Sequence, residues 1–550
     1  ELLCIENPRT DGLMPIMASE VHPLLEQGSQ SGSVAGCVNY KNHPASRSAT
    51  GGWASASFVI GMEMGERFAY YGIASNLITF LTGPLGQSVA TAAANVNAWA
   101  GTSMIFPLLG AFFADFWLGR YRTILYASLL YILGLGLLSL SAELLYLHIS
   151  NADILIYLFF FALYLVAFAQ GGVKPCVQAF GADQFDVKDP KENVAKQSFF
   201  NWWYFCISLS SLLFINLLTY IQDNINWVIG FGIPCIAMIC ALILFILGKR
   251  TYRFSTEMEK MNAYVRIYTV FVMAFKNWRT DETKPLHDGK LLSNQHSGCG
   301  RECGPTEDEE VKSVLRLLPI WLTCIIYALV FSQSSTFFTK QGLTLNRNIV
   351  SGFQLPPACL QSFISMGIVI FIPIYDRVFV PLTRRLTKQP SGITTLQRIG
   401  IGMVLSFVSM TIAALVEMKR LRTAKDYGLV DLPNATLPMS IWCLIPQYFL
   451  FGISDVFTMV GLQEFFYDQV PHNLRSVGLS LYLGIFGVGS FLSTFLITAI
   501  QTTTSRDGQD GWFANNLNRA HLDYFYWLLA GLSAVQFLVF LLLSKYVYLR

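Results

Sequence analysis

Long, mainly apolar stretches are the feature of this 550-residue sequence that most restricts its fold. Four of them are Ala54–Thr82, Ile154–Ala182, Trp227–Leu247 and Tyr524–Leu543, and each reaches or exceeds the roughly 20 residues that a helix needs to cross a bilayer. We count about twelve such stretches, none with the alternation of a barrel strand. With 53% hydrophobic and only 13% charged residues, the chain needs lipid as its solvent. The sequence therefore predicts an all-α membrane protein with twelve transmembrane helices in two six-helix bundles.

The positions of Lys and Arg predict the orientation of these helices. Basic residues gather between the second and third stretches, after the sixth, and between the eighth and ninth. The loops Gly83–Ala90 and Glu143–Asp153 contain none. By the positive-inside rule, both termini are cytoplasmic, and the basic cluster Lys419–Lys425 on the opposite side is an exception. The net charge of +3 is too small to indicate a nucleic-acid partner.

The pattern divides the chain into four segments. Residues 1–50 are polar and rich in Ser and Gly, and we expect a disordered cytoplasmic tail. Residues 51–248 and 312–550 are the two helical bundles. Residues 249–311 are a cytoplasmic linker, in which the apolar spacing of Thr256–Asn277 predicts an amphipathic helix lying against the membrane. An acid and clustered arginines follow the second helix of each half, which favours two bundles rocking around a shared site, although positive-inside anchoring alone would also place arginines there.

Three charged residues lie within the first membrane helix, where an unneeded charge would be costly. Glu63, Glu66 and Arg67 have the i, i+3, i+4 spacing that puts them on one helix face. Two carboxylates beside one guanidinium leave a surplus negative charge, so one acid can take up and release a proton while Arg67 holds the other ionised. The alternative is a static ion-pair network near the end of the helix.

Two further charges lie inside the fourth and tenth membrane helices. Lys174 is expected at the same depth as the first-helix group, and Asp455 is its candidate partner from the opposite half. A salt bridge between them could hold the cytoplasmic side shut until substrate competes for it. Alternatively, Lys174 snorkels to the inner interface and Asp455 pairs within its own half. Glu464, nearer that interface, is interpreted as structural or gating.

Several kinds of chemistry find no support in the sequence. All seven histidines lie in the tail, in loops or at helix ends, so proton coupling has to rest on carboxylates. The eleven cysteines show neither metal-ligand spacing nor a disulfide framework. We therefore expect no metal and no cofactor, with a proton gradient as the driving force. A membrane-embedded enzyme would need a nucleophile–base pair that the membrane stretches do not supply.

The charged first helix also resembles a known family motif. Glu63–Gly72 (EMGERFAYYG) is similar to the helix-one motif of the proton-dependent oligopeptide transporters, whose plant members are the nitrate and peptide transporter family of the major facilitator superfamily. Gly110–Arg122 resembles the superfamily's loop between helices two and three. Gly171–Phe185 (GGVKPCVQAFGADQF) and Phe199–Tyr204 (FFNWWY) match further family signatures. The resemblance spans about Gly52 to Leu543.

This resemblance implies roles for individual residues. It gives Glu63, Glu66 and Arg67 the proton-coupling role and Lys174 a role in substrate binding and coupling. Many relatives have Glu at the position of Asp455, and the shorter acid has a different reach. Some nitrate carriers have a His in helix seven where this chain has Phe331, so nitrate capture by that His does not apply. The resulting candidates are, for substrate binding, Lys174, Asp455, Tyr70, Tyr71, Phe331 and Gln333, and for gating, Asp115, Arg120, Arg122 and Glu464.

Together these features predict a proton-coupled symporter, working as a monomer by alternating access. Its substrate would be a small anionic or zwitterionic solute such as nitrate, a di- or tripeptide or a plant metabolite. A solute-binding sensor and a proton-independent facilitator stay open as alternatives. Ser332–Gly342 and Phe457–Pro471 most resemble a plant subgroup with several vacuolar-membrane members, which favours the vacuolar membrane over the plasma membrane. Glu20, Leu24 and Leu25 fit an acidic dileucine signal for an adaptor protein, a short pattern that also arises by chance.

Overall fold

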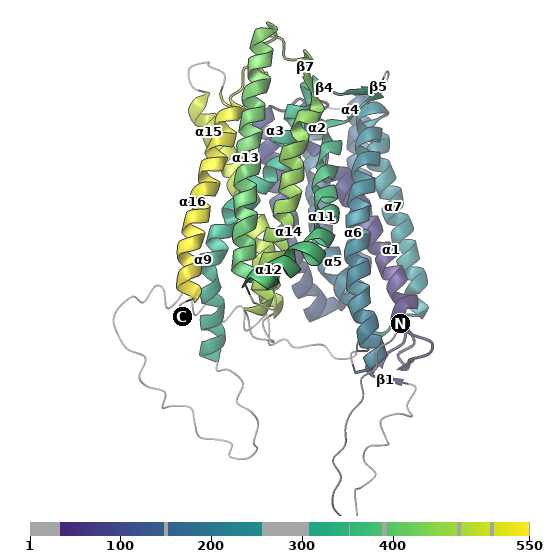
Figure 1. The fold of residues 1–550 in the computed structure, drawn as a ribbon. Coiled ribbons are helices and arrows are strands. Elements are labelled where there is room, and N and C mark those ends of the chain that lie inside the picture. The colour runs from purple at the N-terminus through teal and green to yellow at the C-terminus, as the bar shows by residue number, and fades with distance from the viewer. Residues whose placement is uncertain are drawn as a thin grey trace, which may run out of the picture.

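The computed structural model describes residues 33–147, 152–186, 188–255, 307–350, 353–387, 393–469, 475–505 and 511–548. Its helices run side by side as one elongated assembly, with short strands at both ends (Figure 1). The long helices of these ranges, with α11 as the shortest, are α1 (Gly52–Ala74), α3 (Val89–Phe113), α4 (Arg120–Tyr146), α5 (Ala152–Ala182), α6 (Pro190–Asn224), α7 (Trp227–Leu247), α9 (Glu307–Phe331), α11 (Ser362–Ile374), α13 (Thr395–Asp426), α14 (Ile445–Asp468), α15 (Arg475–Thr504) and α16 (Leu522–Tyr548).

The predicted all-α membrane fold with twelve helices is confirmed. Within the described ranges, ten helical segments are long and apolar enough to cross a membrane. The other two long helices are α1 and α3, which are more polar: α1 carries the three charges of Glu63–Arg67, and α3 carries Asn95 and Asn97. Side-chain caps begin several helices, because they satisfy backbone N–H groups that the first turn leaves free. Asp189 caps α6, and a reciprocal Thr394–Gln397 capping box begins α13.

Short elements interrupt or join the long helices. α3 and α11, the second membrane helix of each half, continue into the π-helical turns η1 (Ala114–Leu118) and η5 (Tyr375–Phe379), and η5 leads into α12 (Val380–Thr387). These turns hold the two acids, Asp115 and Asp376, of the similarity between the halves. The remaining described helices are α2 (Leu77–Thr82), η2 (Gly248–Arg250), η3 (Ser332–Ser335), α10 (Phe337–Leu343), η4 (Pro357–Gln361) and η6 (Ile441–Leu444).

Each bundle is built around close helix pairs. In the N-terminal bundle α5 packs on α3 and α4, and α1 packs on α6 and α7; in the C-terminal bundle α13 packs on α14 and α16, and α9 on α15. The bundles meet mainly where α3 contacts α15 and α6 contacts α11. A Cβ atom at Gly101 would lie 3.0 Å from the carbonyl oxygen of Gly487, so this contact between α3 and α15 brings two backbones together.

Several described hydrogen bonds between the bundles lie toward one end of the molecule. Lys340 of α10 donates to Thr82 Oγ1 (2.8 Å), and Gln361 donates to the carbonyl oxygen of Ser75 (2.7 Å). Asn97 of α3 donates to Ser493 of α15 (2.9 Å). This end lies opposite the one where α1 begins and α16 ends (Figure 1). Three described hydrogen bonds therefore join the two bundles at the end remote from the start of α1 and the end of α16.

Residues 33–50 differ from the expected disordered tail. β1 (Ser33–Val38) pairs antiparallel with β2 (Pro44–Ser46) and with β3 (Phe254–Ser255), in the order β2-β1-β3. No apolar stretch predicts this sheet, because backbone pairing with a distant segment makes it. Among the side chains of β1 and β2 whose burial is described, Val34 and Ala45 are the buried apolar ones. Other short pairs are β4 (Leu345–Asn346) with β7 (Leu437–Ser440) and β5 (Asn348–Val350) with β6 (Phe353–Gln354).

Three other predictions concern residues at the edges of the described ranges or outside them. The first helix of the C-terminal bundle begins at Glu307 rather than at residue 312. The amphipathic helix expected over Thr256–Asn277 lies outside the described residues. So do Glu20, Leu24 and Leu25.

Candidate substrate and proton site

The guanidinium of Arg67 in α1 is shared by two acids of the same helix, and Glu63, Glu66 and Arg67 are called the α1 group below. Arg67 Nε is 2.7 Å from Glu63 Oε1 and 3.3 Å from Glu66 Oε2. Glu63 and Glu66 are almost fully buried, at 2% and 0% exposure. One oxygen of each acid, Oε2 in both cases, has no hydrogen-bond partner among the described residues. The helical spacing thus brings the three groups together, with one more carboxylate than Arg67 can neutralise and with free lone pairs to receive a proton.

Helix α5 contributes two polar side chains, one turn apart, to the same group. Gln170 Nε2 donates to Glu66 Oε1 at 2.8 Å, and Lys174 Nζ lies 4.4 Å from the centroid of the Tyr70 ring. The Tyr70 ring stacks on Trp99 of α3, with 5.9 Å between centroids. Lys174 is close enough to Glu63, Glu66 and Arg67 to interact with them electrostatically. The structure therefore brings Lys174 to the α1 group, where an aromatic face is its described neighbour.

Asp455 of α14 has a partner in its own bundle. The Tyr327 hydroxyl of α9 donates to Asp455 Oδ1 at 2.5 Å, and Ser454 donates to the Tyr327 oxygen at 3.3 Å. Asp455 is 3% exposed. The Lys174–Asp455 salt bridge is not formed in this conformation, which instead has the within-half pairing that the sequence left open.

The other candidate substrate residues occupy different environments. Tyr71 is half-buried beside Tyr70, with ring centroids 5.3 Å apart. Phe331 is half-buried against the rings of Phe451 and Phe486. Gln333 is completely buried and donates to Ser493 Oγ (3.0 Å), the atom that also accepts from Asn97. In this conformation Gln333 is part of the buried contact between the two bundles and is not accessible to a solute.

Sequence reasoning missed three contacts of this site: Gln170, Tyr327 and Trp99. The position of Gln170, four residues before Lys174, was a usable signal because i and i+4 share a helix face. Tyr327 and Trp99 reach their partners across helices that are distant in sequence, and no local pattern marks them.

A sequence model of the POT family matches residues 121–513 of this chain. The chain belongs to the POT family of transporters. Two similar plant proteins, both from Arabidopsis thaliana, are Protein NRT1/PTR FAMILY 5.10 and 5.16. They are 60% and 54% identical, over 92% and 97% of this chain and 95% and 99% of the relatives. The predicted family is thereby confirmed, and the protein is a transporter and not an enzyme.

Solved transporters of the POT family share this fold. An auto-inhibited POT family peptide transporter superposes with a TM-score of 0.70 at 23% identity, covering 89% of this chain and 96% of that one. PepTSo superposes with a TM-score of 0.69 at 20% identity, covering 90% and 98%. The major facilitator architecture predicted from the sequence agrees with these likenesses.

The candidate gating residues of this POT-family chain lie toward the end where α1 begins. Arg120 pairs with Asp183 at 2.5 Å, while Arg122 is exposed. Glu464 lies 3.4 Å from Arg398, whose guanidinium also covers the Tyr375 ring at 4.5 Å. Asp115 lies in the π-helical turn η1, and its side chain is outside the described set. Both described ion pairs join helices or loops of a single bundle.

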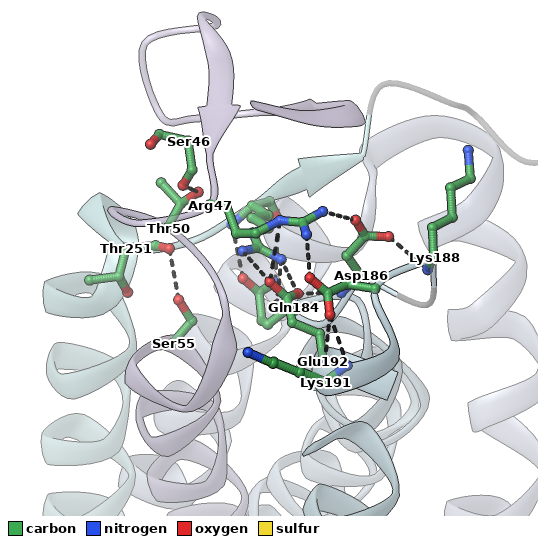
Figure 2. Close-up of polar contacts among 12 residues, drawn as sticks. Ser46, Arg47, Thr50, Ser55, Gln184, Asp186, Lys188, Lys191, Glu192 and Thr251 are labelled. Atoms are coloured by element: carbon green, nitrogen blue, oxygen red, sulfur yellow. Dashed lines mark hydrogen bonds and ion pairs between the residues drawn. The ribbon is translucent and has the colours of Figure 1, made fainter. Parts of the chain in front are cut away.

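A second group of charges fastens the N-terminal strands to the same end. Figure 2 shows Arg47 directed at Asp186, with Nη2 2.6 Å from Oδ2, and Arg47 also pairs with Asp189. Buried Arg253 pairs with Glu192 at 2.6 Å. Burial opposes ionisation of Glu192, but hydrogen bonds from Arg253 and from the Asp186 amide outweigh it and hold the pKa of this carboxyl below its ordinary value.

The C-terminal bundle contains a buried ion pair that explains part of the charge exception. Arg420 and Glu417 of α13 are both 0% exposed and joined at 2.6 Å. Gln341 donates to Glu417 (2.7 Å), and Arg420 donates to Asn518 (2.8 Å) and to the Leu517 carbonyl (2.6 Å). Arg420 therefore has a structural role inside the protein, and it is not a surface charge that anchors a loop.

Proposed function

We propose that this transporter is a proton-coupled symporter of a small anionic or zwitterionic solute, working by alternating access. The observation that carries the proposal is the α1 group, in which Arg67 is shared by two buried acids beside Lys174. A buried, incompletely neutralised carboxylate gains from binding a proton. Stable ion pairing alone would not require the second acid.

Lys174 is the cation best placed to receive an anionic solute. Its described contact is the face of Tyr70, and such a cation–π contact is worth about 0.5–2 kcal/mol. A carboxylate or nitrate can replace the ring with charge-assisted hydrogen bonds, which are stronger and directional. For a monovalent anion, the proton on the glutamates and the anion on Lys174 then enter together, so the loaded site adds no net charge to the membrane interior. This balance of charge links the two binding events.

Alternating access is supported by the placement of the contacts between the bundles. Several described hydrogen bonds that join them lie at the end opposite the start of α1 and the end of α16. Opening this end requires Lys340 to leave Thr82 and Gln361 to leave Ser75. The described pairs of candidate gating residues at the other end, Arg120–Asp183 and Arg398–Glu464, each stay within one bundle. We assign this conformation to the state that faces the cytoplasm, with both termini on that side.

For the site of action we propose the vacuolar membrane, on the subgroup resemblance of the sequence. Because the vacuolar lumen is acidic, symport would then drive solute into the cytoplasm. Glu20, Leu24 and Leu25 would supply the adaptor signal. Replacing Leu24 and Leu25 together by Ala in a fluorescently tagged copy should move the protein to the plasma membrane. Plasma-membrane fluorescence of the unmodified protein would overturn both the address and the direction of transport.

Purified protein in proteoliposomes tests the transport reaction. With an acidic outside, we expect accumulation of at least one solute from a panel of nitrate, di- and tripeptides, and small amino or carboxylic acids, and its collapse with a protonophore. The panel includes 5-aminolevulinic acid, which a structurally similar POT family transporter binds. Uptake of a solute at the same rate and to the same level with and without the proton gradient would indicate a facilitator instead.

A further inference from the structure

We propose that Gln170 is a positioning residue for proton coupling, whose carboxamide turns over so that it remains hydrogen-bonded to Glu66 in both protonation states of that acid. The proposal rests on the proposed symport and extends it to a residue outside the charged group. Gln170 does not itself carry the proton; it keeps the carboxyl group of Glu66 in one place while the proton comes and goes.

The geometry at Gln170 has three parts. The side chain is completely buried. Its Nε2 donates to Glu66 Oε1 at 2.8 Å, which is the orientation that an ionised carboxylate requires, since a carboxylate can only accept. Its Oε1 is buried without a hydrogen-bond partner among the described residues. A buried amide oxygen left without a donor is costly, so its presence next to a titratable acid calls for an explanation.

The missing donor appears when Glu66 is protonated. A carboxylic acid carries one O–H donor, and a half-turn about the last side-chain bond of Gln170 exchanges its N–H for its oxygen at the same position. That torsion is broad and nearly two-fold in energy, so the turn needs no backbone movement. An apolar side chain could satisfy neither state, and a charged donor could satisfy only the ionised one.

The backbone on which Gln170 sits is held in place by close packing. A Cβ at Gly171 would lie 2.7 Å from the Phe106 side chain of α3, and a Cβ at Gly172 would lie 2.7 Å from that of Ala127 of α4. Immediately after Gln170, the backbone of α5 therefore packs closely against α3 and α4. The amide can turn while its point of attachment stays fixed.

Other titratable groups surround this contact and bear on its pH dependence. On α1 these are Glu63, Arg67 and the phenols of Tyr70 and Tyr71, and on α5 it is Lys174. From α4 comes Tyr131, fully buried, with a hydroxyl that has no described hydrogen-bond partner and lies within electrostatic reach of Glu66. None of these groups has a described hydrogen bond to Glu66 through which it could donate to the ionised acid and accept from the protonated acid.

Infrared difference spectroscopy of purified protein tests the proposal without transport. The C=O stretching band of protonated Glu66 is assigned by its loss in Glu66→Gln. In Gln170→Met, which keeps the length but loses the amide, we expect this band to shift in frequency. Gln178→Met, the same change lower on α5, is the matched control and should leave the band unchanged.

A second measurement needs no change at Gln170. The wild-type spectrum between high and low pH should contain a side-chain amide change that disappears in Glu66→Gln, even if Gln170→Met fails to fold. A Glu66 band identical in wild type and folded Gln170→Met, or no amide change in wild type, overturns the role of Gln170. Neither result touches symport, which the proteoliposome assay decides. Conversely, if both spectral changes occur but no solute is taken up in response to the proton gradient, Gln170 is supported as the partner of Glu66 in both protonation states, and symport is overturned.

Discussion

Two buried groups of glutamate and arginine lie in membrane helices of this transporter, one in each bundle, and they differ in how their charges are matched. In α13, Glu417 faces one arginine, and both of its oxygens accept hydrogen bonds from Arg420, with a further one from Gln341. In α1, Glu63 and Glu66 share Arg67, and one oxygen of each acid stays without a hydrogen bond among the described residues.

The difference lies in how completely the buried acids of each group are paired and hydrogen-bonded. Both groups have the helical spacing that sequence reasoning treats as a signal, and both are buried. The α13 pair has one acid and one arginine, and both oxygens of Glu417 are hydrogen-bonded. In the α1 group two acids share Arg67, the second nearby cation is Lys174, and one oxygen of each acid has no described hydrogen bond, an arrangement that fits the proposed proton coupling. Incomplete pairing of buried acids, more than a charge within a membrane helix by itself, is therefore the feature that supports the proposed coupling.

The sharpest way to break this comparison is to neutralise one of the two α1 acids. Glu66→Gln should abolish acid-driven accumulation, because a neutral amide cannot carry the proton. Counterflow exchange of labelled solute should persist, since the bundles can still rock. The measurement is uptake at matched protein density, with Glu143→Gln near the far end of α4 as control. Accumulation equal to wild type in Glu66→Gln would remove the α1 group from coupling.

The α13 pair should respond in stability instead. Arg420→Met leaves Glu417 buried and unpaired, and breaking such a pair typically costs about 3–5 kcal/mol. Replacing both, Glu417→Leu with Arg420→Met, should recover most of this loss. Thermal unfolding in detergent measures the effect, with exposed Arg422→Met on the same helix as control. If Arg420→Met is as stable as that control, the pair is not structural and the contrast fails.

A third test concerns the pair that this conformation does not form. We expect Lys174→Ala and Asp455→Ala each to impair transport, and their effects to be non-additive by about 1 kcal/mol or more if the two side chains meet in another state of the cycle. Tyr327→Phe, which removes the described partner of Asp455, controls for loss of the contact within the bundle. Additive losses in the double-mutant cycle would indicate that Lys174 does not pair with Asp455 and acts only with Glu63, Glu66 and Arg67.

The smallest expected effect lies outside the membrane, at Glu192. The pKa of this carboxyl is lowered in the folded protein, so the group contributes stability at neutral pH that is lost as pH falls through the lowered value. A partly exposed pair of this kind is worth about 1 kcal/mol or less. Glu192→Gln should therefore make the unfolding temperature slightly less sensitive to acid than in wild type. Asp431→Asn, at an exposed ion pair, should change nothing, and an equal effect of both would assign no special role to Glu192.

Much of the membrane fold followed from local patterns. The apolar stretches predicted the helices because lipid leaves a backbone few other ways to satisfy its hydrogen bonds. The i, i+3, i+4 spacing predicted that Glu63, Glu66 and Arg67 lie together, because residues three and four apart share one face of a helix. The strands formed by residues 33–50 were missed, because their partner β3 is about two hundred residues away in the chain and pairs through the backbone.

What the sequence determined by itself is the set of helices, their family and the groups that share a helix face. The tertiary structure alone decided which group each charge meets: Glu66 meets Gln170, Asp455 meets Tyr327, and Arg420 meets Asn518. It also decided that three described hydrogen bonds join the bundles at the end remote from the start of α1 and the end of α16. The physical reason is that periodicity describes one element at a time, whereas the partner of a buried charge comes from another helix, and its position depends on how the whole bundle packs.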